Sequence, residues 1–334
     1  MYINFLGRKL LKMDSNKTKV YRSKHKDIPG NPSTAKSSIH KLNTREKGES
    51  LRVLTEEQWQ FWIEKGYVVI KSAISTEQAK ETAAFLWEFE EKKFNDSTTW
   101  YTPPRAEMQM KELAGTGMVE VYNNQYLWNN RQTPKVYDAF VDIWGTNKLW
   151  VTIDRANLNF PIRKGHEYKG FIHWDYDPET KPQNVQGVIA LSDQTDTNMG
   201  GFQCLPWLYQ NYDTWKMSQP DDRNRFQPDI SGLEDKIEKV AMQAGDLLIF
   251  NSLLAHGIRP NLSDNKVRIA QYISMMPSEE QNESLKNWRI NSWRNRVAPE
   301  GHAFPGDPRN WEQTKYDTAQ LSSLGEKLLG LTSW

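Results

Sequence analysis

The segment FIHWD, residues 171–175, places a histidine and an aspartate two positions apart within a run of aromatic and β-branched residues. Such a run is typical of a β-strand. Side chains alternate between the two faces of a strand, so His173 and Asp175 are expected to project from one face while Trp174 points away. One imidazole and one carboxylate on a shared face form a candidate pair of metal ligands.

A second histidine follows another predicted strand, in the segment AGDLLIFNSLLAHGIRP at residues 244–260. Gly245 and Asp246 indicate a tight turn, the apolar residues 247–250 indicate a buried strand, and His256 marks its functional end. A bare His-x-Asp motif occurs by chance in many proteins, so this context matters. Two histidines and one carboxylate on one face of a metal leave the opposite positions open for a co-substrate and dioxygen, which suits non-haem Fe(II) oxygenation.

An arginine lies twelve residues beyond His256, inside the alternating run KVRIAQYI at residues 266–273. A guanidinium is a planar fork of donors that matches a carboxylate bidentately. Arg268 on an inward strand face beside the metal would therefore bind the far carboxylate of 2-oxoglutarate. The alternative is an ordinary strand arginine whose stem packs while its charged head stays in water.

These segments together resemble the phytanoyl-CoA dioxygenase family of Fe(II)- and 2-oxoglutarate-dependent oxygenases. The resemblance spans roughly residues 52–280 and includes WVTIDRANLNFP, at 150–161, as the strand that enters the barrel before the metal dyad. It rests on FIHWD, NMGGFQCLPW at 198–207, AGDLLIFNSLLAHG at 244–257 and the arginine that follows. After GGFQCLP many members have Gly-Ser-His, whereas this chain has Trp207, Leu208 and Tyr209. The turn is therefore expected to differ there.

The resemblance implies a mainly β fold with flanking α-helices around a double-stranded β-helix, also called a jelly roll or cupin-like barrel. It implies Fe(II) held by His173, Asp175 and His256, with Arg268 on 2-oxoglutarate and dioxygen as the remaining co-substrate. Related halogenases replace the carboxylate by a small residue, so Asp175 favours hydroxylation or another oxidation without halide.

The family resemblance also leads us to expect a polar side chain from the strand before the dyad near 2-oxoglutarate. Asn157 is our choice. Asp154, Arg155 and Asn159 compete with it, because sequence alone does not fix the register of a strand.

Length and composition agree with one catalytic domain that carries extensions. The chain has 334 residues, 37% of them hydrophobic, and its 14 Trp, 13 Tyr and 12 Phe supply a large core despite a mean hydropathy of -0.78. We expect a basic, polar and partly disordered N-terminal extension at 1–50, an oxygenase domain at 51–284, and an aromatic-rich C-terminal extension with a helix at 285–334 that packs on the barrel.

Charge and cysteine content bear on partners and compartment. The net charge of the chain is only +1, so no nucleic-acid partner is expected. Positive charge is concentrated in residues 1–50, which hold twelve Lys or Arg against four Asp or Glu. No apolar run is long enough for a membrane span or signal sequence. The single cysteine, Cys204, cannot form an internal disulfide, so a cytoplasmic location is expected. The sequence leaves the oligomeric state open.

Accessory helices and substrate contacts are predicted around the barrel. Helix starts are indicated near Thr55 and Ser75, the first helix ending at Gly66 and the second at about Lys93. The aromatic and amide-rich stretch 118–128 is expected near the mouth of a site for a small-molecule substrate, although loop scaffolding is the competing interpretation. Candidate substrate-binding residues are Tyr122, Asn123, Gln125 and Trp174.

Two other classes of protein stay open at this point. One is a cupin-like metalloenzyme, an isomerase or hydrolase, that does not use 2-oxoglutarate and binds an acidic substrate through Arg268. The other is a non-catalytic ligand-binding jelly roll, because a fold alone does not dictate chemistry.

Overall fold

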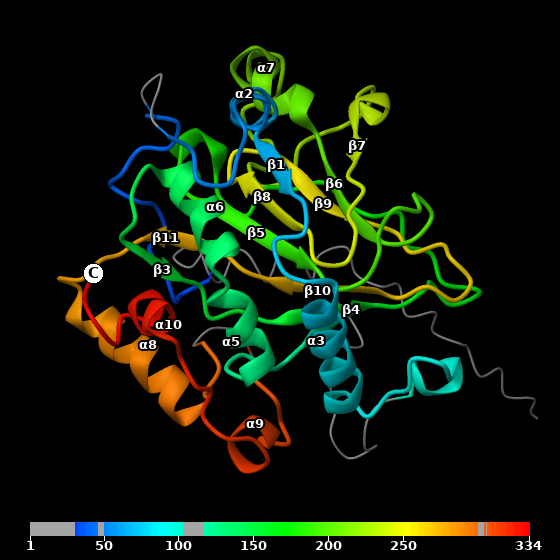
Figure 1. Cartoon of the computed structure of the whole chain (residues 1–334). Coiled ribbons are helices and arrows are strands. Elements are labelled where there is room, and N and C mark those ends of the chain that lie inside the picture. The colour runs from blue at the N-terminus through cyan, green and yellow to red at the C-terminus, as the bar shows by residue number, and fades with distance from the viewer. Residues whose placement is uncertain (1–30, 46–49, 103–116, 300–303, 305) are drawn as a thin grey trace, which may run out of the picture.

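The computed structural model describes residues 31–45, 50–102, 117–299, 304 and 306–334 (Figure 1). Strands form the centre of the molecule, and helices cover it. The described helices are α2 (Glu56–Lys65), α3 (Thr76–Phe89), α5 (Gln125–Arg131), α6 (Pro134–Trp144), α7 (Pro206–Met217), α8 (Glu283–Asn295), α9 (Trp311–Thr314) and α10 (Ser323–Leu329), with short 3-10 turns at Ser97–Thr99, Pro178–Thr180 and Glu234–Lys236.

The first helix illustrates how local sequence sets these boundaries. The Thr55 hydroxyl accepts a hydrogen bond from the backbone N–H of Gln58, whose side chain returns one to the backbone N–H of Thr55. This capping box satisfies two donors that the helix cannot pair internally. Gly66 ends α2 with φ 76°, a left-handed conformation that glycine adopts without steric cost. Helix α3 starts after Ser75 as predicted, but it ends at Phe89, four residues earlier than expected.

The larger sheet has six antiparallel strands in the order β1-β8-β5-β10-β4-β2. Its central register pairs Arg268 with Asn159 and Ala270 with both Asn157 and Ala190. The strands are β1 (Tyr67–Ile70), β2 (Met118–Val119), β4 (Ala156–Asn159), β5 (Val185–Ala190), β8 (Leu247–Asn251) and β10 (Arg268–Tyr272).

A smaller sheet faces the larger one. It has the order β7-β6-β9, with β6 at Gly201–Cys204, β7 at Glu238–Lys239 and β9 at His256–Arg259. Side chains from both sheets share one buried cluster, among them Val188, Phe250 and Ala270 from the larger sheet and Phe202 and Cys204 from the smaller. The two sheets therefore enclose a common interior.

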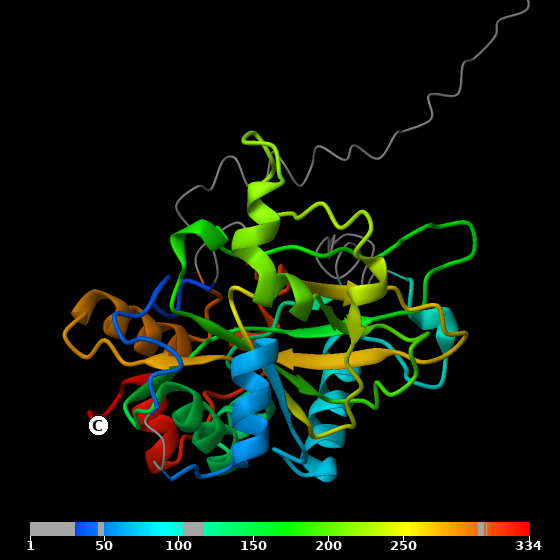
Figure 2. The same ribbon diagram turned by 90° about the horizontal axis from the view of Figure 1, so that it is seen from above.

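The outer face of the larger sheet is covered by helices. Ile189, Ile249 and Ile269, which alternate with the inward residues of their strands, pack in the main hydrophobic core with α3, α5 and α6. Helix α7 packs instead in a separate cluster with Ile172, Trp174 and Ala255, and Figure 2 shows α6 and α7 on opposite sides of the strands. This arrangement leaves the space between the sheets for a site.

Two strand predictions were wrong in detail. Residues 150–161 form two strands rather than one, because β3 (Leu149–Val151) pairs with β11 (Met275–Pro277) in a separate sheet while β4 pairs with β10 and β2. Residues 171–175 do not form a strand; His173 makes one isolated bridge to His256. Gly170, at φ 76°, turns the chain just before this bridge.

The described parts of both chain ends pack on this fold. Ser33 is fully buried, and its hydroxyl accepts a hydrogen bond from the backbone N–H of Ile153, so packed structure extends N-terminal of Leu51. Near the C-terminus, the buried Arg289 of α8 donates to the carbonyl oxygens of Ser33, Val151, Leu328 and Leu329. That one side chain joins α8 to β3, α10 and the N-terminal segment.

Within the described ranges, no helix combines the length and the apolar character that crossing a bilayer requires.

Candidate metal centre

Two histidines that lie 83 positions apart are held together by their backbones. The backbone N–H of His173 donates to the carbonyl oxygen of His256 at 2.8 Å, and the N–H of His256 donates to the carbonyl of His173 at 2.9 Å. Gly257 permits this approach, since a Cβ there would lie 1.8 Å from the Phe171 carbonyl oxygen. The two imidazole rings consequently lie with their centroids 4.8 Å apart.

Backbone carbonyls fix which ring nitrogen of each histidine carries the proton. Nδ1 of His173 lies 2.9 Å from the carbonyl oxygen of His256, and Nδ1 of His256 lies 3.0 Å from that of Leu254. A carbonyl oxygen only accepts, so each Nδ1 must donate. In the neutral imidazole the other nitrogen, Nε2, then keeps a lone pair for a metal.

The carboxylate of Asp175 lies between these two lone pairs. Its Oδ1 is 3.1 Å from Nε2 of His173, and its Oδ2 is 3.3 Å from Nε2 of His256. With Nδ1 protonated on each neutral ring, these four atoms are all electron-pair donors, and they repel one another unless a proton or a metal cation lies between them. Two ligands about 2.1 Å from a metal and at right angles are about 3.0 Å apart, so the spacing fits three ligands on one face of a metal ion.

Of the described residues, His173, Asp175 and His256 form the group that could hold a metal, with ligand atoms within 4.8 Å of one another. Desolvation acts to raise the pKa of the Asp175 carboxyl, but the adjoining imidazoles, His173 first, outweigh it and hold the pKa well below its usual value. The carboxylate is therefore ionised and available as a ligand. Its side chain stays 32% exposed, so the group is reachable from solvent.

Aromatic rings restrict both imidazoles. The His256 ring stacks on Phe202 at 5.8 Å between centroids and contacts Phe250 at 4.4 Å. Phe171, which is 40% exposed, lies 4.8 Å from the His173 ring. Rings packed this closely limit rotation of the ligands and keep water from the buried side of the centre.

Arg268 lies fully buried on β10, and its guanidinium is only partly satisfied. Nη1 donates to Oδ1 of Asn157 at 2.9 Å, and Nε donates to Oε1 of Gln194 at 3.4 Å. Nη2 is buried and has no hydrogen-bond partner among the described residues. A buried guanidinium with an unsatisfied edge is a site for an anion.

A second buried arginine adds to this positive charge. Burial, followed by repulsion from Arg268, lowers the pKa of Arg259 to about 10. Arg259 donates to the carbonyls of Met199, Phe202, Val240, Gln194 and Asp196. Asp196 offsets part of the Arg259 charge, whereas Arg268 forms no ion pair with a carboxylate of the described residues.

The structure brings five predicted residues into two groups and leaves the other four outside them. His173, Asp175 and His256 converge, and Asn157 contacts Arg268. Of Asn157's competitors, Arg155 pairs instead with Glu120. Asn123 and Gln125 bond to the C-terminal segment, Tyr122 donates to Glu120, and Trp174 donates to the Leu253 carbonyl while packing against Tyr212 and Trp215.

Sequence reasoning missed two glutamines. Nε2 of Gln186 donates to Oδ2 of Asp175 at 2.9 Å, and Gln194 contacts Arg268. Gln186 could have been found as a polar residue inside the apolar strand VQGVIA. Gln194 lies after β5 in the polar run SDQTDTN and carries no such signal.

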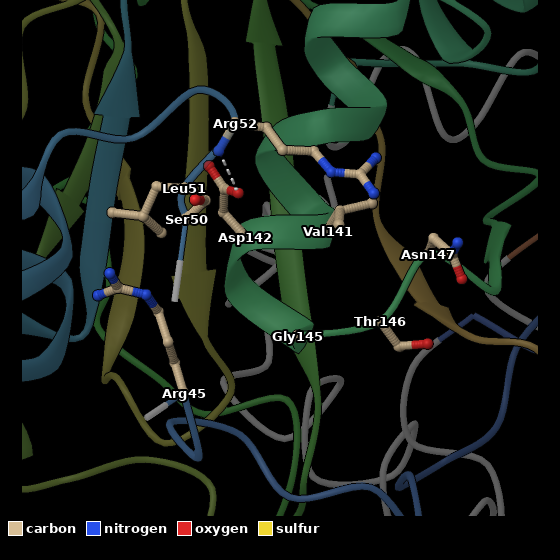
Figure 3. Close-up of a pocket in the computed structure, with 9 residues that line it drawn as sticks. All are labelled: Arg45, Ser50, Leu51, Arg52, Val141, Asp142, Gly145, Thr146 and Asn147. Carbon is tan, nitrogen blue, oxygen red and sulfur yellow. Dashed lines mark hydrogen bonds between the residues drawn. The ribbon is translucent and has the colours of Figure 1, made fainter. Parts of the chain in front are cut away.

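A separate pocket of about 350 Å³ lies beside α6 and contains none of these residues (Figure 3). Its carboxylate, Asp142, accepts hydrogen bonds from the backbone N–H groups of Arg52, Val53 and Leu54. Both arginines of its wall are paired, Arg45 with Glu56 and Arg52 with Asp138. These contacts account for the charged side chains of the pocket as parts of the folded structure.

Comparison with known families gives a match over most of the strand region. A sequence model of the family described as phytanoyl-CoA dioxygenase (PhyH) matches residues 62–270. The Ava biosynthesis cluster protein O of Aspergillus versicolor is 26% identical over 241 residues, which cover 64% of this chain and 75% of that protein.

Solved structures share the fold at low identity. The GlcNAc-inducible protein GIG2 of Candida albicans has a TM-score of 0.60 at 13% identity, covering 84% of this chain and 77% of that one. A hypothetical protein of Escherichia coli has a TM-score of 0.59 at 17% identity, covering 83% and 82%.

Proposed function

Because the chain belongs to the phytanoyl-CoA dioxygenase family, we propose that it is an Fe(II)- and 2-oxoglutarate-dependent dioxygenase. It hydroxylates or otherwise oxidises an unactivated C–H bond of a small organic substrate. The observation that carries the proposal is the convergence of His173, Asp175 and His256 within 4.8 Å. Mainly β sheets with covering helices agree with it, and we propose that the two facing sheets form a double-stranded β-helix.

The metal-binding residues act through fixed lone pairs. His173 and His256 would hold Fe(II) through Nε2, since each Nδ1 is committed to a carbonyl, and Asp175 would supply an oxygen. When bound, the iron together with 2-oxoglutarate and dioxygen supplies the oxidising chemistry, with release of succinate and CO2. The rings of Phe202 and Phe250 orient His256 and exclude water behind it.

Arg268 would bind the distal carboxylate of 2-oxoglutarate. Its unsatisfied Nη2 and the nearby charge of Arg259 favour an anion, and Asn157 and Gln194 hold the guanidinium plane in place. Asn157 is thus proposed as a neighbour of the co-substrate. Tyr122, Asn123, Gln125 and Trp174 are left out of the proposed site because their contacts lie elsewhere.

The proposal has two further parts, which concern the cellular compartment and the kind of oxidation. The single cysteine suits a reducing compartment such as the cytoplasm. The presence of Asp175 favours an oxidation without halide incorporation.

The experiment is succinate release from 2-oxoglutarate by the full chain, reconstituted with Fe(II) without oxygen and then exposed to air with a panel of candidate substrates. We expect substrate-stimulated succinate in the wild type and in a His166→Ala control, whose histidine is exposed in the preceding loop. Asp175→Ala should abolish the stimulation. Equal succinate from Asp175→Ala and wild type would remove the carboxylate from the reaction.

A further inference from the structure

We propose that Gln186 is a positioning residue that holds one oxygen of Asp175 and so keeps this ligand on the metal through its other oxygen alone. The inference rests on the proposed function and concerns how many coordination positions the protein leaves open.

Gln186 points into the space between the sheets. Val185 and Ile189 of its strand pack in the outer core, whereas Val188 and Ala190 pack in the cluster shared by the two sheets. Side chains alternate along a strand, so Gln186 faces the same side as Val188 and Ala190. A carboxamide at an inward position of a central strand is costly unless it forms hydrogen bonds.

The hydrogen bond of Gln186 crosses the interior. Gln186 lies on β5 of the larger sheet, while Asp175 follows the bridge that joins His173 to β9 of the smaller sheet. The register of β5 and β8 places Gln186 opposite Phe250, the ring that contacts His256. Gln186 therefore lies directly across the strand pair from Phe250, whose ring packs on the imidazole of His256.

The two oxygens of Asp175 have different surroundings. Oδ1 is 3.1 Å from Nε2 of His173, whereas Oδ2 is 3.3 Å from Nε2 of His256 and also accepts from Nε2 of Gln186 at 2.9 Å. The carboxamide donates, and the ionised carboxylate only accepts. This hydrogen bond occupies one lone pair of Oδ2 and makes that oxygen a weaker metal ligand than Oδ1, which is therefore the oxygen assigned to coordination.

Binding through one oxygen matters for the co-substrates. An octahedral metal with two imidazoles and one carboxylate oxygen retains three positions, which suffice for two atoms of 2-oxoglutarate and one of dioxygen. A carboxylate bound through both oxygens would take one of those positions. Loss of the Gln186 donor should therefore weaken 2-oxoglutarate binding while the metal itself is retained.

The test uses the full chain loaded with Co(II), whose visible absorption reports coordination number, under conditions without turnover. Gln186→Leu removes the donor, and Gln186→Asn keeps the carboxamide but shortens its reach. Both variants should bind Co(II) within a few-fold of wild type, show an altered Co(II) spectrum before 2-oxoglutarate is added, and bind 2-oxoglutarate about 10-fold more weakly, as expected for one lost hydrogen bond.

Gln194→Leu is the matched control, because Gln194 is another glutamine of this interior but contacts Arg268. It should weaken 2-oxoglutarate binding without changing the spectrum of the Co(II) protein alone. An unchanged spectrum and unchanged 2-oxoglutarate affinity in Gln186→Leu would overturn the inference, and so would complete loss of Co(II). If wild type binds neither Co(II) nor 2-oxoglutarate, it is the proposed function that fails.

Discussion

The Nδ1 atom of His173 lies 2.9 Å from the carbonyl oxygen of His256, so the backbone of one proposed metal ligand fixes the ring of the other. The same carbonyl also accepts the backbone N–H of His173 at 2.8 Å. The spacing and the tautomer of the centre thus depend on close pairing of residues 171–173 with β9.

Gly257→Ala should disturb that pairing, because the added Cβ would lie 1.8 Å from the Phe171 carbonyl oxygen. We expect metal affinity to fall by about 10-fold or more, the usual cost of displacing groups that orient a ligand. Titration with Co(II) measures it. Gly232→Ala serves as control, because at φ 77° it carries the backbone strain of an alanine, but nothing lies within 4 Å of a Cβ there. Unaltered affinity in Gly257→Ala would show that the pairing does not set the centre.

Arg268→Lys should lower 2-oxoglutarate affinity by about 10-fold or more, because a lysine ammonium cannot present the two parallel donors of a guanidinium. Isothermal titration of the metal-loaded protein with 2-oxoglutarate measures the change. Lys266→Ala, which removes an exposed cation two positions earlier, should bind as wild type does. Wild-type affinity in Arg268→Lys would place the co-substrate elsewhere.

Glu90 should make folding stability depend on pH. It is fully buried, neither oxygen has a hydrogen-bond partner among the described residues, and desolvation raises its pKa from 4.5 to about 8, against the opposing effect of Arg309 and Lys92. The folded state therefore favours the protonated form, so the contribution of Glu90 to stability is greatest below pH 4.5 and is lost as the pH rises to about 8.

Glu90→Gln should remove that loss. The urea concentration at its unfolding midpoint, relative to that of wild type, should therefore be higher at pH 8 than at pH 5. Urea unfolding at the two pH values measures this difference. Glu88→Gln, an exposed change in the last turn of α3 two positions before Glu90, should follow wild type at both. A parallel fall in wild type and Glu90→Gln would refute the assignment.

Arg289→Ala should destabilise the fold by about 3 kcal/mol or more, because buried carbonyl oxygens of three separate segments lose their donor. Burial lowers the pKa of Arg289 to about 9. The buried guanidinium therefore depends on the hydrogen bonds to those carbonyl oxygens to stay charged. Denaturant unfolding measures the effect. Arg294→Ala, exposed on the same helix, should change stability little. Equal stability of the two variants would mean that Arg289 does not join these segments.

The candidate metal-binding residues could be picked out from the sequence because their signals are local. His173 and Asp175 are two positions apart, His256 follows a buried apolar strand, and Arg268 lies in an alternating run. Gln186 is recognisable in the sequence as a polar residue of an apolar strand, but its contact with Asp175 is not, because that contact depends on how two sheets face each other. The same reason explains residues 150–161, since the break between β3 and β4 reflects pairing with strands more than a hundred positions away.

The most direct test is a crystal structure of the Fe(II)-loaded protein with 2-oxoglutarate, prepared without oxygen, with iron located by its anomalous scattering. We expect iron within bonding distance of Nε2 of His173, Nε2 of His256 and one oxygen of Asp175, with the distal carboxylate of 2-oxoglutarate on Arg268. Iron away from these three side chains, or 2-oxoglutarate bound without Arg268, would contradict it.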